Sequence, residues 1–321
     1  MQDSSQLGEF IAHLYEKYKE VDEGTVAAYI PELSKANPAD FGICLVTVDG
    51  QEFSVGDWDK EFTIQSICKP FAFLMALERH GRDRTLAHVG VEPSGDAFNS
   101  VELDPKSTRP YNPMVNAGAI AVASLIKGDS PDVGVSAFVD KLGRAAGRNL
   151  RIDDTVCASE AATGYRNRAM AYLMLNFGLI DEHVEHTLHQ YFSQCSVLVS
   201  CRDLAVMGAT LANMGENPLT HEEVFDVQYV KDILAVMFTC GMYDYAGEWA
   251  YRVGVPAKSG VGGGVMAVVN RQLGIAVYSP RLDARGNSVR GIKVCTDLAN
   301  EFGLHAFDFM NFGSNFIRAM L

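Results

Sequence analysis

The sequence predicts a mixed α/β (α+β) protein. We expect an antiparallel five-stranded sheet covered by helices on both faces, with a large all-helical part inserted. Two observations carry this prediction: short β-type runs gather near both ends of the 321-residue chain, and the stretch between them has helical texture. Because tight turns separate most of the β-type runs, the strands are best combined into one antiparallel sheet.

The N-terminal part contains a helix and a hairpin. Apolar residues at helical spacing predict an amphipathic helix over residues 5–20. The β-type runs 41–48 and 51–56 follow, and the dipeptide Asp49-Gly50 stands between them. That dipeptide between two apolar runs is a strong short-range signal for a hairpin turn.

The C-terminal part supplies the other three strands. Residues 252–259, 264–270 and 272–279 are β-type runs separated by glycine-rich or polar turns, and residues 291–302 have a helical pattern. Five helical patterns occupy the middle of the chain, at residues 133–146, 165–177, 182–193, 201–214 and 227–239.

These elements suggest how the layers are arranged. We expect the terminal helices to cover one face of the sheet and the apolar helix that follows Ser66 to cover the other. No Pro/Ser-rich linker interrupts the chain, so residues 1–321 are interpreted as a single catalytic unit. In this interpretation a sheet subdomain from 1–80 plus 245–321 carries a helical subdomain, 81–244, and a cleft lies between them.

Bulk composition excludes several classes of partner. The net charge of −13 argues against nucleic acid, which needs clustered Lys and Arg, and against an anionic membrane surface. No run reaches the roughly 18 apolar residues of a spanning helix. Residues 1–20 lack the basic and apolar pattern of a secretory signal, and the seven cysteines form no CxxC pair. We therefore expect a cytoplasmic protein with neither membrane nor nucleic-acid partner.

The first chemical motif is Ser66-x-x-Lys69, within Phe62-Thr-Ile-Gln-Ser-Ile-Cys-Lys-Pro-Phe71. Pro70 is tolerated only in the first turn of a helix, so the helix begins near Ser66, with both side chains on one side. A serine becomes a nucleophile when a neighbouring base takes its proton, and a buried lysine with a lowered pKa can be that base. Alone, this pattern also fits a capping serine followed by a solvated lysine.

A second motif, Lys258-Ser259-Gly260, favours the catalytic interpretation. It stands at the end of a predicted strand and is followed by residues 261–264, Val-Gly-Gly-Gly, where backbone can approach a ligand closely. A basic strand edge with a hydroxyl and glycines suits a carboxylate-bearing substrate and an oxyanion hole. Ser-x-x-Lys early and Lys-Ser-Gly late is the motif order of serine β-lactamases and penicillin-binding proteins.

Across almost its whole length the sequence resembles the serine-dependent glutaminases, relatives of the β-lactamases. The resemblance is carried by Tyr29-Ile-Pro-Glu-Leu33, Gln65-Ser-Ile-Cys-Lys-Pro70, Tyr111-Asn-Pro-Met-Val-Asn-Ala-Gly118, Ser159-Glu through Asn167, Tyr191, Cys240-Gly-Met-Tyr-Asp244 and Ala257-Lys-Ser-Gly-Val-Gly-Gly-Gly264. It implies a β-lactamase-like fold and hydrolysis of L-glutamine to L-glutamate and ammonia through a seryl ester, without metal or organic cofactor. It also implies a homodimer or homotetramer.

The same resemblance assigns roles to individual residues. Ser66 is the implied nucleophile, Lys69 its proton partner and Tyr243 a second proton-transfer group. The implied substrate contacts are Tyr29, Ser66, Asn116, Glu160, Asn167, Tyr191, Tyr243 and Val261, and the N–H groups of Ser66 and Val261 are the implied oxyanion hole. Residue chemistry agrees, since a carboxylate can meet the substrate ammonium while amides and phenols can meet its carboxylate. On a continuous helix, Glu160 and Asn167 would share a face.

Other interpretations stay open at this point. A β-lactamase or D-alanyl peptidase and a non-catalytic ligand sensor are the alternative functions. His183, His186 and His189 diverge too far around one helix to converge on a metal, so we expect a solvated polar face. Cys68 is expected to pack, and residues 262–264 lack the spacing of a phosphate loop. Residues 91–100, rich in Gly, Pro and Ser, are a candidate mobile lid.

Overall fold

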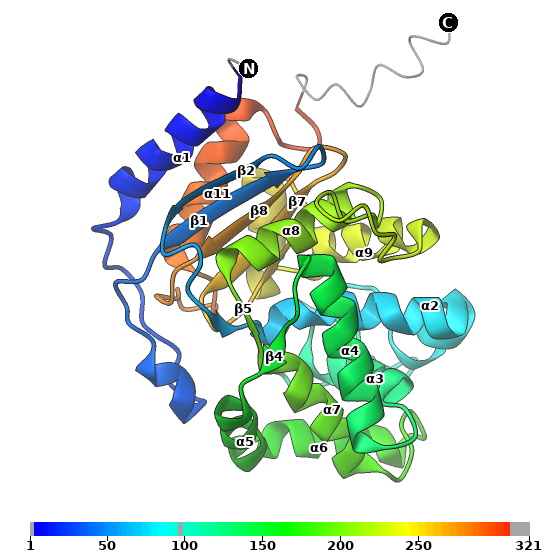
Figure 1. Ribbon diagram of the computed structural model, residues 1–321. Helices are drawn as coiled ribbons and strands as arrows, with labels where there is room; N and C mark the ends of the chain where they lie inside the picture. Colours follow the sequence, from blue (N-terminus) through cyan, green and yellow to red (C-terminus); the bar gives the residue numbers. More distant parts are fainter. Residues whose placement is uncertain (1–2, 96–98, 309–321) are drawn as a thin grey trace, which may run out of the picture.

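The sheet predicted from the two chain ends is present. The computed structural model describes residues 3–95 and 99–308, and its central sheet is antiparallel with the strand order β2-β1-β8-β7-β6 (Figure 1). The strands are β1 (Gly42–Thr47), β2 (Glu52–Gly56), β6 (Ala257–Ser259), β7 (Gly264–Val269) and β8 (Leu273–Tyr278). Antiparallel pairing of β1 with β2 confirms the predicted hairpin.

Burial along the strands follows their place in the sheet. The central strands β7 and β8 are buried at every residue, whereas the edge strand β2 alternates between exposed and half-buried residues. The predicted strand 252–259 is too long, because residues 246–252 form helix α10 (Ala246–Arg252). Trp249 is fully buried there and its indole N–H donates to the carbonyl of Val255 at 2.8 Å, so the chain turns before β6 begins.

Helices α1 (Asp3–Tyr18) and α11 (Val289–Phe302) pack against one face of the sheet, as expected (Figure 1). The other face is covered by α8 (Cys201–Ala212), which lies across β1, β7 and β8. The expectation that the helix after Ser66 covers this face is wrong. The fit is too close for a side chain at Gly274, where a Cβ would meet the Ala205 carbonyl oxygen at 2.2 Å. Small residues thus let α8 lie directly on the sheet.

The helix after Ser66, α2 (Cys68–His88), packs instead on helices of the inserted part. The others there are α3 (Asn116–Ile126), α4 (Pro131–Ala146), α5 (Asp154–Thr163), α6 (Tyr165–Asn176), α7 (Val184–Cys195) and α9 (Val227–Cys240), with 3-10 turns η1 (Pro31–Lys35), η2 (Gln65–Ile67) and η3 (Tyr243–Tyr245) elsewhere. α2 contacts α3 and α9, which explains why it is apolar on all sides. No helix of the described ranges is long and apolar enough to cross a membrane.

A small sheet that the sequence did not predict links the two parts of the molecule. Its strands are β3 (Phe62–Thr63), β5 (Val197–Val199) and β4 (Arg151–Ile152), in the order β3-β5-β4. Strands of two or three residues are too short to show a period of two. Because β3 ends three residues before Ser66, this sheet holds the chain that leads into the Ser-x-x-Lys motif.

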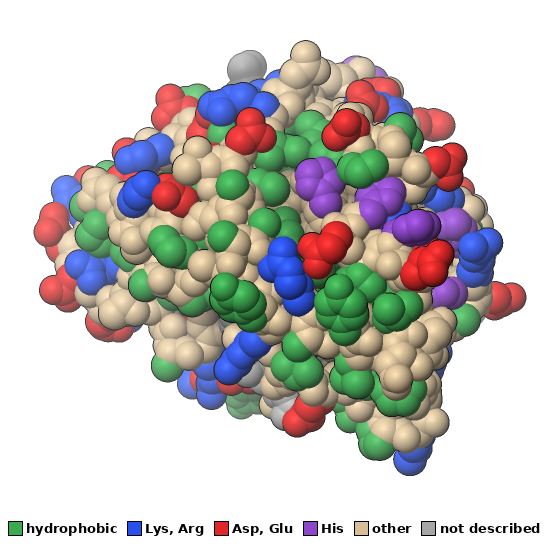
Figure 2. All heavy atoms as spheres, turned by 90° about the horizontal axis from the view of Figure 1, so that it is seen from below, with side chains coloured by type: hydrophobic (Ala, Val, Ile, Leu, Met, Phe, Trp, Pro, Cys, Tyr) green, Lys and Arg blue, Asp and Glu red, His purple; other side chains and the backbone are tan. Residues whose placement is uncertain are grey.

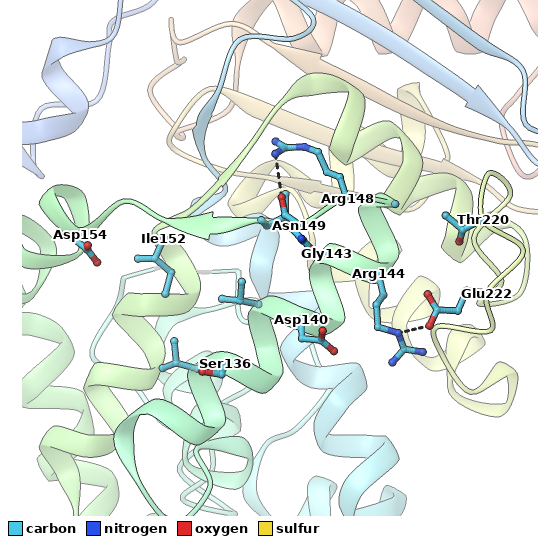
Figure 3. Close-up of a pocket in the computed structure, with 14 residues that line it drawn as sticks. Ser136, Asp140, Gly143, Arg144, Arg148, Asn149, Ile152, Asp154, Thr220 and Glu222 are labelled. Atoms are coloured by element: carbon cyan, nitrogen blue, oxygen red, sulfur yellow. Dashed lines mark hydrogen bonds and ion pairs between the residues drawn. The ribbon is translucent and has the colours of Figure 1, made fainter.

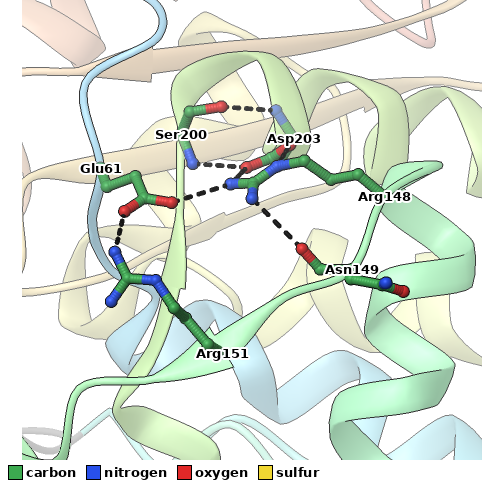
Figure 4. A network of polar contacts seen from close by, with 6 residues as sticks. All are labelled: Glu61, Arg148, Asn149, Arg151, Ser200 and Asp203. Carbon is green, nitrogen blue, oxygen red and sulfur yellow. Dashed lines mark hydrogen bonds and ion pairs between the residues drawn. The ribbon is translucent and has the colours of Figure 1, made fainter.

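Beside the small sheet, an ionic network joins segments far apart in the sequence (Figure 4). Arg148 donates to both carboxylate oxygens of Asp203, at 2.8 and 2.6 Å, and its guanidinium also lies 3.3 Å from Glu61. The Asp203 side chain is buried, and it caps α8 together with Ser200. Glu61, which immediately precedes β3, also pairs with the more exposed Arg151.

Replacing Arg148 by alanine is therefore expected to destabilise the fold. The substitution leaves a buried carboxylate without its cation, and we expect a loss of about 2–4 kcal/mol in the free energy of unfolding by chemical denaturation. Arg151→Ala is the matched control, because its side chain is 67% exposed and exposed pairs contribute only about 0–1 kcal/mol. Equal losses in the two variants would contradict a role for the buried pair.

We propose that the sheet part (1–80 plus 245–321) and the helical part (81–244) unfold as a single unit. One continuous apolar core supports this, since it runs from Val46 and Met266 of the sheet through α8 into α2 and α3. Thermal unfolding should accordingly show one transition, with the same midpoint by far-ultraviolet circular dichroism and by calorimetry.

Candidate active site

The Ser-x-x-Lys motif lies in a strained turn at the start of α2. Ser66 is the middle residue of η2, and the α-helix begins at Cys68, close to the predicted start. Gln65, immediately before the serine, has a left-handed backbone with φ of 49°. Such a conformation is costly outside glycine and is found most often at functional sites, where surrounding structure enforces it. The buried Gln65 side chain donates to the Thr63 hydroxyl at 3.2 Å, which helps to hold the turn.

Tyr243 is the immediate side-chain partner of Ser66. The two side chains share a hydrogen bond, and the Tyr243 hydroxyl also donates to the carbonyl oxygen of Ser259 at 3.0 Å. A phenol has one proton, so the Ser66 hydroxyl is the donor in their shared hydrogen bond. Tyr243 has a left-handed φ of 57°, and burial raises the pKa of its phenol above the ordinary value.

Lys69 is buried and its ammonium group is held at a defined position. Its Nζ donates to the Met114 carbonyl at 3.1 Å and to the Asn116 side-chain oxygen at 2.7 Å. Burial lowers the pKa of Lys69 to about 8, against the opposing effects of nearby cysteines and Glu160. About a tenth of the lysine is therefore the neutral amine at pH 7, and the share grows as pH rises, as a proton-accepting lysine requires.

The Lys-Ser-Gly motif is brought beside the turn, but Lys258 does not face a substrate. Its Nζ is fully buried and donates to the carbonyls of Gly241 and Ser259, at 2.9 and 2.7 Å. It also lies 4.1 Å from the centre of the Tyr243 ring. The expectation of a basic strand edge open to a carboxylate is thus wrong. Lys258 instead ties the loop before Tyr243 to strand β6.

The glycines after this motif allow close packing against other parts of the chain, where the sequence suggested a close approach to a ligand. A Cβ at Gly262 would lie 2.6 Å from the carbonyl oxygen of Thr63, only three residues before Ser66. The absence of a side chain therefore lets the loop before β7 lie against the backbone of β3. Val261 is buried in the same loop and packs in one apolar cluster with Tyr243.

A cavity of 330 Å³ opens beside Ser66. Six of the nine predicted site residues line it, namely Tyr29, Ser66, Asn116, Glu160, Asn167 and Tyr191. The remaining three adjoin it: Lys69 through Asn116, Tyr243 through Ser66, and Val261 through its packing with Tyr243. Gln65 and Cys195 also line the cavity, although neither was predicted as a site residue from the sequence. The signal for Gln65 was its place beside the serine, whereas Cys195 had none.

Glu160 is the acidic group of this cavity. Its side chain is buried, and its Oε2 atom accepts no hydrogen bond. Burial raises the pKa of Glu160 to about 8, an effect that nearby Lys69 partly offsets. A buried carboxylate oxygen without a donor costs free energy unless a ligand supplies one. Glu160 can thus receive a cationic group.

Amide and phenol groups form much of the remaining lining, which also includes the exposed Arg166. The Asn116 amide donates to the Asn167 side-chain oxygen at 3.2 Å, so the two amides orient each other. The continuous helix considered for Glu160 and Asn167 is absent, because the chain breaks at Gly164 between α5 and α6. Both side chains nevertheless line the same cavity. Burial raises the pKa of the Tyr191 phenol well above 10.0, which keeps it a hydrogen-bond donor, whereas the Tyr29 side chain is 56% exposed.

The raised pKa of Glu160 makes a prediction about stability. Between its ordinary value of 4.5 and about 8 the folded protein holds the proton more tightly than the unfolded chain, so stability falls as pH rises through this window. A glutamine side chain in place of Glu160 has no proton to titrate in this range. Glu160→Gln should therefore exceed the wild type in free energy of unfolding by on the order of a few kcal/mol above pH 8, and match it near pH 4. Urea unfolding at both pH values measures this, and a pH-independent difference would contradict it.

The histidines, Cys68 and the candidate lid were the other features that the sequence singled out. His183 and His189 are exposed, and Figure 2 shows histidine side chains gathered on one part of the face seen from below. No group of three or more His, Cys, Asp or Glu in the described ranges could hold a metal ion. Cys68 packs as expected, with its sulfur 4.0 Å from that of Cys195. In the candidate lid 91–100, residues 96–98 lie outside the described residues.

A larger cavity of 720 Å³ lies on the outer side of α4 (Figure 3). It is open, and none of the nine predicted site residues lines it. Two of its arginines already contact carboxylates, Arg144 with Glu222 at 2.6 Å and Arg148 with Asp203. The smaller cavity beside Ser66 therefore remains the candidate active site.

Fold and site together define a class. The five-stranded antiparallel sheet lies between helices, and the Ser-x-x-Lys turn lies beside the edge strand that carries Lys-Ser-Gly. This arrangement is the β-lactamase-like fold.

The comparisons with known proteins identify the family. The glutaminase family model matches residues 24–307, so the chain belongs to the glutaminase family. A glutaminase from Nostoc sp. is 58% identical over 310 residues, which cover 97% of this chain and 93% of that protein. A solved probable glutaminase has a TM-score of 0.90 at 38% identity and covers 94% of this chain and 98% of its own. Mglu in its glutamate form has a TM-score of 0.90 at 42% identity, covering 94% and 70%.

Proposed function

We propose that this chain hydrolyses the side-chain amide of L-glutamine to L-glutamate and ammonia through an ester on Ser66. The observation that carries the proposal is the pairing of two features in one cavity. One wall presents Ser66, hydrogen-bonded to Tyr243, and another presents the buried Glu160 oxygen that accepts no hydrogen bond. Membership of the glutaminase family and the glutamate form of a 42% identical structure support the same substrate.

The cavity matches both ends of an α-amino acid. The Glu160 carboxylate would bind the substrate ammonium, because it is the acidic residue among the groups that line the cavity. The amides of Asn116 and Asn167 and the phenols of Tyr29 and Tyr191 would donate to the substrate carboxylate. The side-chain amide would then point toward Ser66. A β-lactam such as benzylpenicillin, whose only charged group is a carboxylate, lacks the ammonium that Glu160 would bind.

The first half-reaction forms the ester. The Ser66 oxygen attacks the amide carbon, and its proton passes to the neutral amine of Lys69, because the neutral Tyr243 phenol keeps its own proton at this stage. Lys69 returns this proton to Tyr243 after the phenol has protonated the leaving nitrogen. The N–H groups of Ser66 and Val261 would stabilise the oxyanion, as donors at a helix start and a glycine-rich loop can do. The carbon–nitrogen bond then breaks, and the nitrogen takes a proton from the phenol as ammonia leaves.

The second half-reaction reverses the proton path. Water attacks the ester carbon, gives a proton to the Tyr243–Lys69 pair, and releases glutamate as the Ser66 oxygen is reprotonated. Ser66, Lys69, Tyr243 and Val261 would thus supply the nucleophile, the proton transfer and the charge stabilisation in both halves.

Two finer points belong to the proposal. We propose a homodimer or homotetramer, which exposed aromatic side chains on α6 support, since Tyr165 and Tyr172 are 76% and 53% exposed. We also propose a cytoplasmic location, which the seven free cysteines suit because a reducing compartment keeps thiols unpaired. Light scattering during size exclusion tests the first point, and fractionation of the source cells tests the second.

The deciding experiment compares substrates. Ammonia release from L-glutamine, L-asparagine and D-glutamine is measured beside turnover of a chromogenic β-lactam. The proposal expects release from L-glutamine, with the three other compounds lower by about a hundredfold or more in kcat/KM. Preferential β-lactam turnover would move the function to a β-lactamase or D-alanyl peptidase. Binding of L-glutamine without turnover would indicate a ligand sensor.

A further inference from the structure

Two buried thiols lie beside the reactive turn, and the proposed mechanism uses neither of them. The Sγ atom of Cys68 is 4.0 Å from the Sγ atom of Cys195, although the two residues are 127 positions apart in the chain. The residues are only 1% and 2% exposed, and both thiols are free. The sulfur atoms of a disulfide are about 2.0 Å apart, so an approach of about 2 Å would join this pair.

Both cysteines stand at the end of a helix. Cys68 is the first residue of α2, two positions after Ser66, and Cys195 is the last residue of α7. Residues at helix ends make fewer backbone hydrogen bonds than residues inside a helix, so they move at lower cost. α7 also contacts the η2 turn that carries Ser66. A bond between the two sulfurs would therefore pull the reactive turn toward the end of α7.

The substrate cavity gives a small oxidant access to this pair. Cys195 is one of the residues that line the 330 Å³ cavity, which has room for several molecules of the size of water, at about 30 Å³ each. A thiol reacts with an oxidant as the thiolate. The hydrogen bond with Cys68 and burial raise the pKa of the Cys195 thiol well above its ordinary value, an effect that nearby Lys69 opposes. The neutral amine of Lys69, whose charged form interacts with both sulfurs, is the base that can take the thiol proton.

We infer that Cys68 and Cys195 form a redox-sensitive dithiol, which an oxidant of the peroxide class converts into a disulfide and which a small dithiol restores. In a reducing compartment such disulfides are usually transient and serve redox sensing. The effect on catalysis rests on the proposed function. Lys69 directly follows Cys68, so the disulfide would move its amine away from Met114 and Asn116, which hold it in place. Hydrolysis would accordingly slow while the disulfide is present.

The oxidation proceeds in two balanced steps. The Cys195 sulfur attacks one oxygen of hydrogen peroxide, the oxygen–oxygen bond breaks, and the thiol proton reaches the departing hydroxide through Lys69 to give water. The Cys68 sulfur then attacks the sulfur of the Cys195 sulfenic acid, a sulfur–sulfur bond forms, and the sulfur–oxygen bond breaks to release a second water. The two thiols thus lose two electrons and two protons in total, and one peroxide molecule is reduced to two molecules of water.

The test compares the wild type with Cys68→Ala and Cys195→Ala, and Cys157→Ser is the matched control. Cys157 is more exposed than the other six cysteines, and its sulfur lies 3.8 Å from the Ser193 hydroxyl. Each protein is treated with hydrogen peroxide, and catalase then removes the excess. Mass spectrometry of unreduced peptides identifies the disulfide, and ammonia release from L-glutamine is measured before and after addition of dithiothreitol.

In the wild type and in Cys157→Ser we expect the peptide that contains Cys68 to be linked to the peptide that contains Cys195. Ammonia release should fall by about tenfold or more and return after dithiothreitol is added. Cys195→Ala should stay within about twofold of its own untreated rate. In Cys68→Ala the link cannot form, and Cys195 should proceed to the sulfinic acid, which dithiothreitol does not reduce.

Two results would overturn the inference. One is a wild type in which peroxide oxidises Cys157 while the two peptides stay unlinked, and the other is a loss of activity in Cys195→Ala equal to that of the wild type. Linked peptides in a wild type that never releases ammonia from L-glutamine would instead contradict the proposed function and leave the dithiol standing.

Discussion

Ser66→Ala is expected to lower kcat for glutamine hydrolysis by about 10⁴-fold or more, without loss of fold. In the proposed mechanism the oxygen of the Ser66 hydroxyl, in the middle of the η2 turn, forms the ester, and alanine has no atom that replaces it. Alanine removes one hydrogen bond, to Tyr243, so the melting temperature should change by only a few degrees. Steady-state ammonia release and a thermal melt measure the two quantities.

Two controls make this result specific. Ser136→Ala removes an exposed serine from the larger cavity beside α4 and should leave kcat unchanged. Acid quenching during turnover should trap a glutamyl group on the peptide that contains Ser66 in the wild type, and none in Ser66→Ala. Full activity in Ser66→Ala, or a glutamyl group on another peptide, would remove the proposed mechanism.

Lys69→Met should lower kcat by about 10³-fold, because it removes the amine that accepts the serine proton in the proposed mechanism, while nearly conserving the buried volume. The substitution also leaves the Met114 carbonyl and the Asn116 oxygen without their donor, so some loss of stability is expected. Lys127→Met is the matched control. Lys127 is likewise buried and pairs with Asp181, away from the cavity. The Lys127→Met variant should therefore be less stable than the wild type but have the same kcat.

The pH profile separates the two buried groups of the cavity. Because the neutral amine of Lys69 accumulates as pH rises through about 8, kcat/KM should increase across that region. Burial also raises the pKa of Glu160 to about 8, and its ionised form is required to hold the substrate ammonium. Glu160→Gln should weaken glutamine binding but keep the increase of kcat/KM with pH, because that increase comes from the deprotonation of Lys69. A flat profile in this variant would assign the increase to Glu160.

Local patterns in the sequence determined much of the sheet and of the reactive turn. Asp49-Gly50 predicted the β1–β2 hairpin, and Pro70 placed the start of α2 close to where the structure has it. Hairpin turns and helix starts depend on neighbouring residues, so a single sequence carries their signals. No local pattern predicted the substrate contacts. Residues such as Asn116 and Glu160 were selected by the resemblance of the sequence to a family.

Tertiary packing decided the remaining features. The sequence does not show that α8 covers the sheet in place of α2, because apolar helices look alike until the close approach at Gly274 selects one. It also does not show that Lys258 is buried under Tyr243, or that burial shifts the pKa values of Lys69 and Glu160 toward each other. Burial and the distances between charges arise from residues far apart in the chain. The sequence alone thus predicted which groups react, whereas only the folded structure decided how deeply each group is buried and that most of them line one cavity.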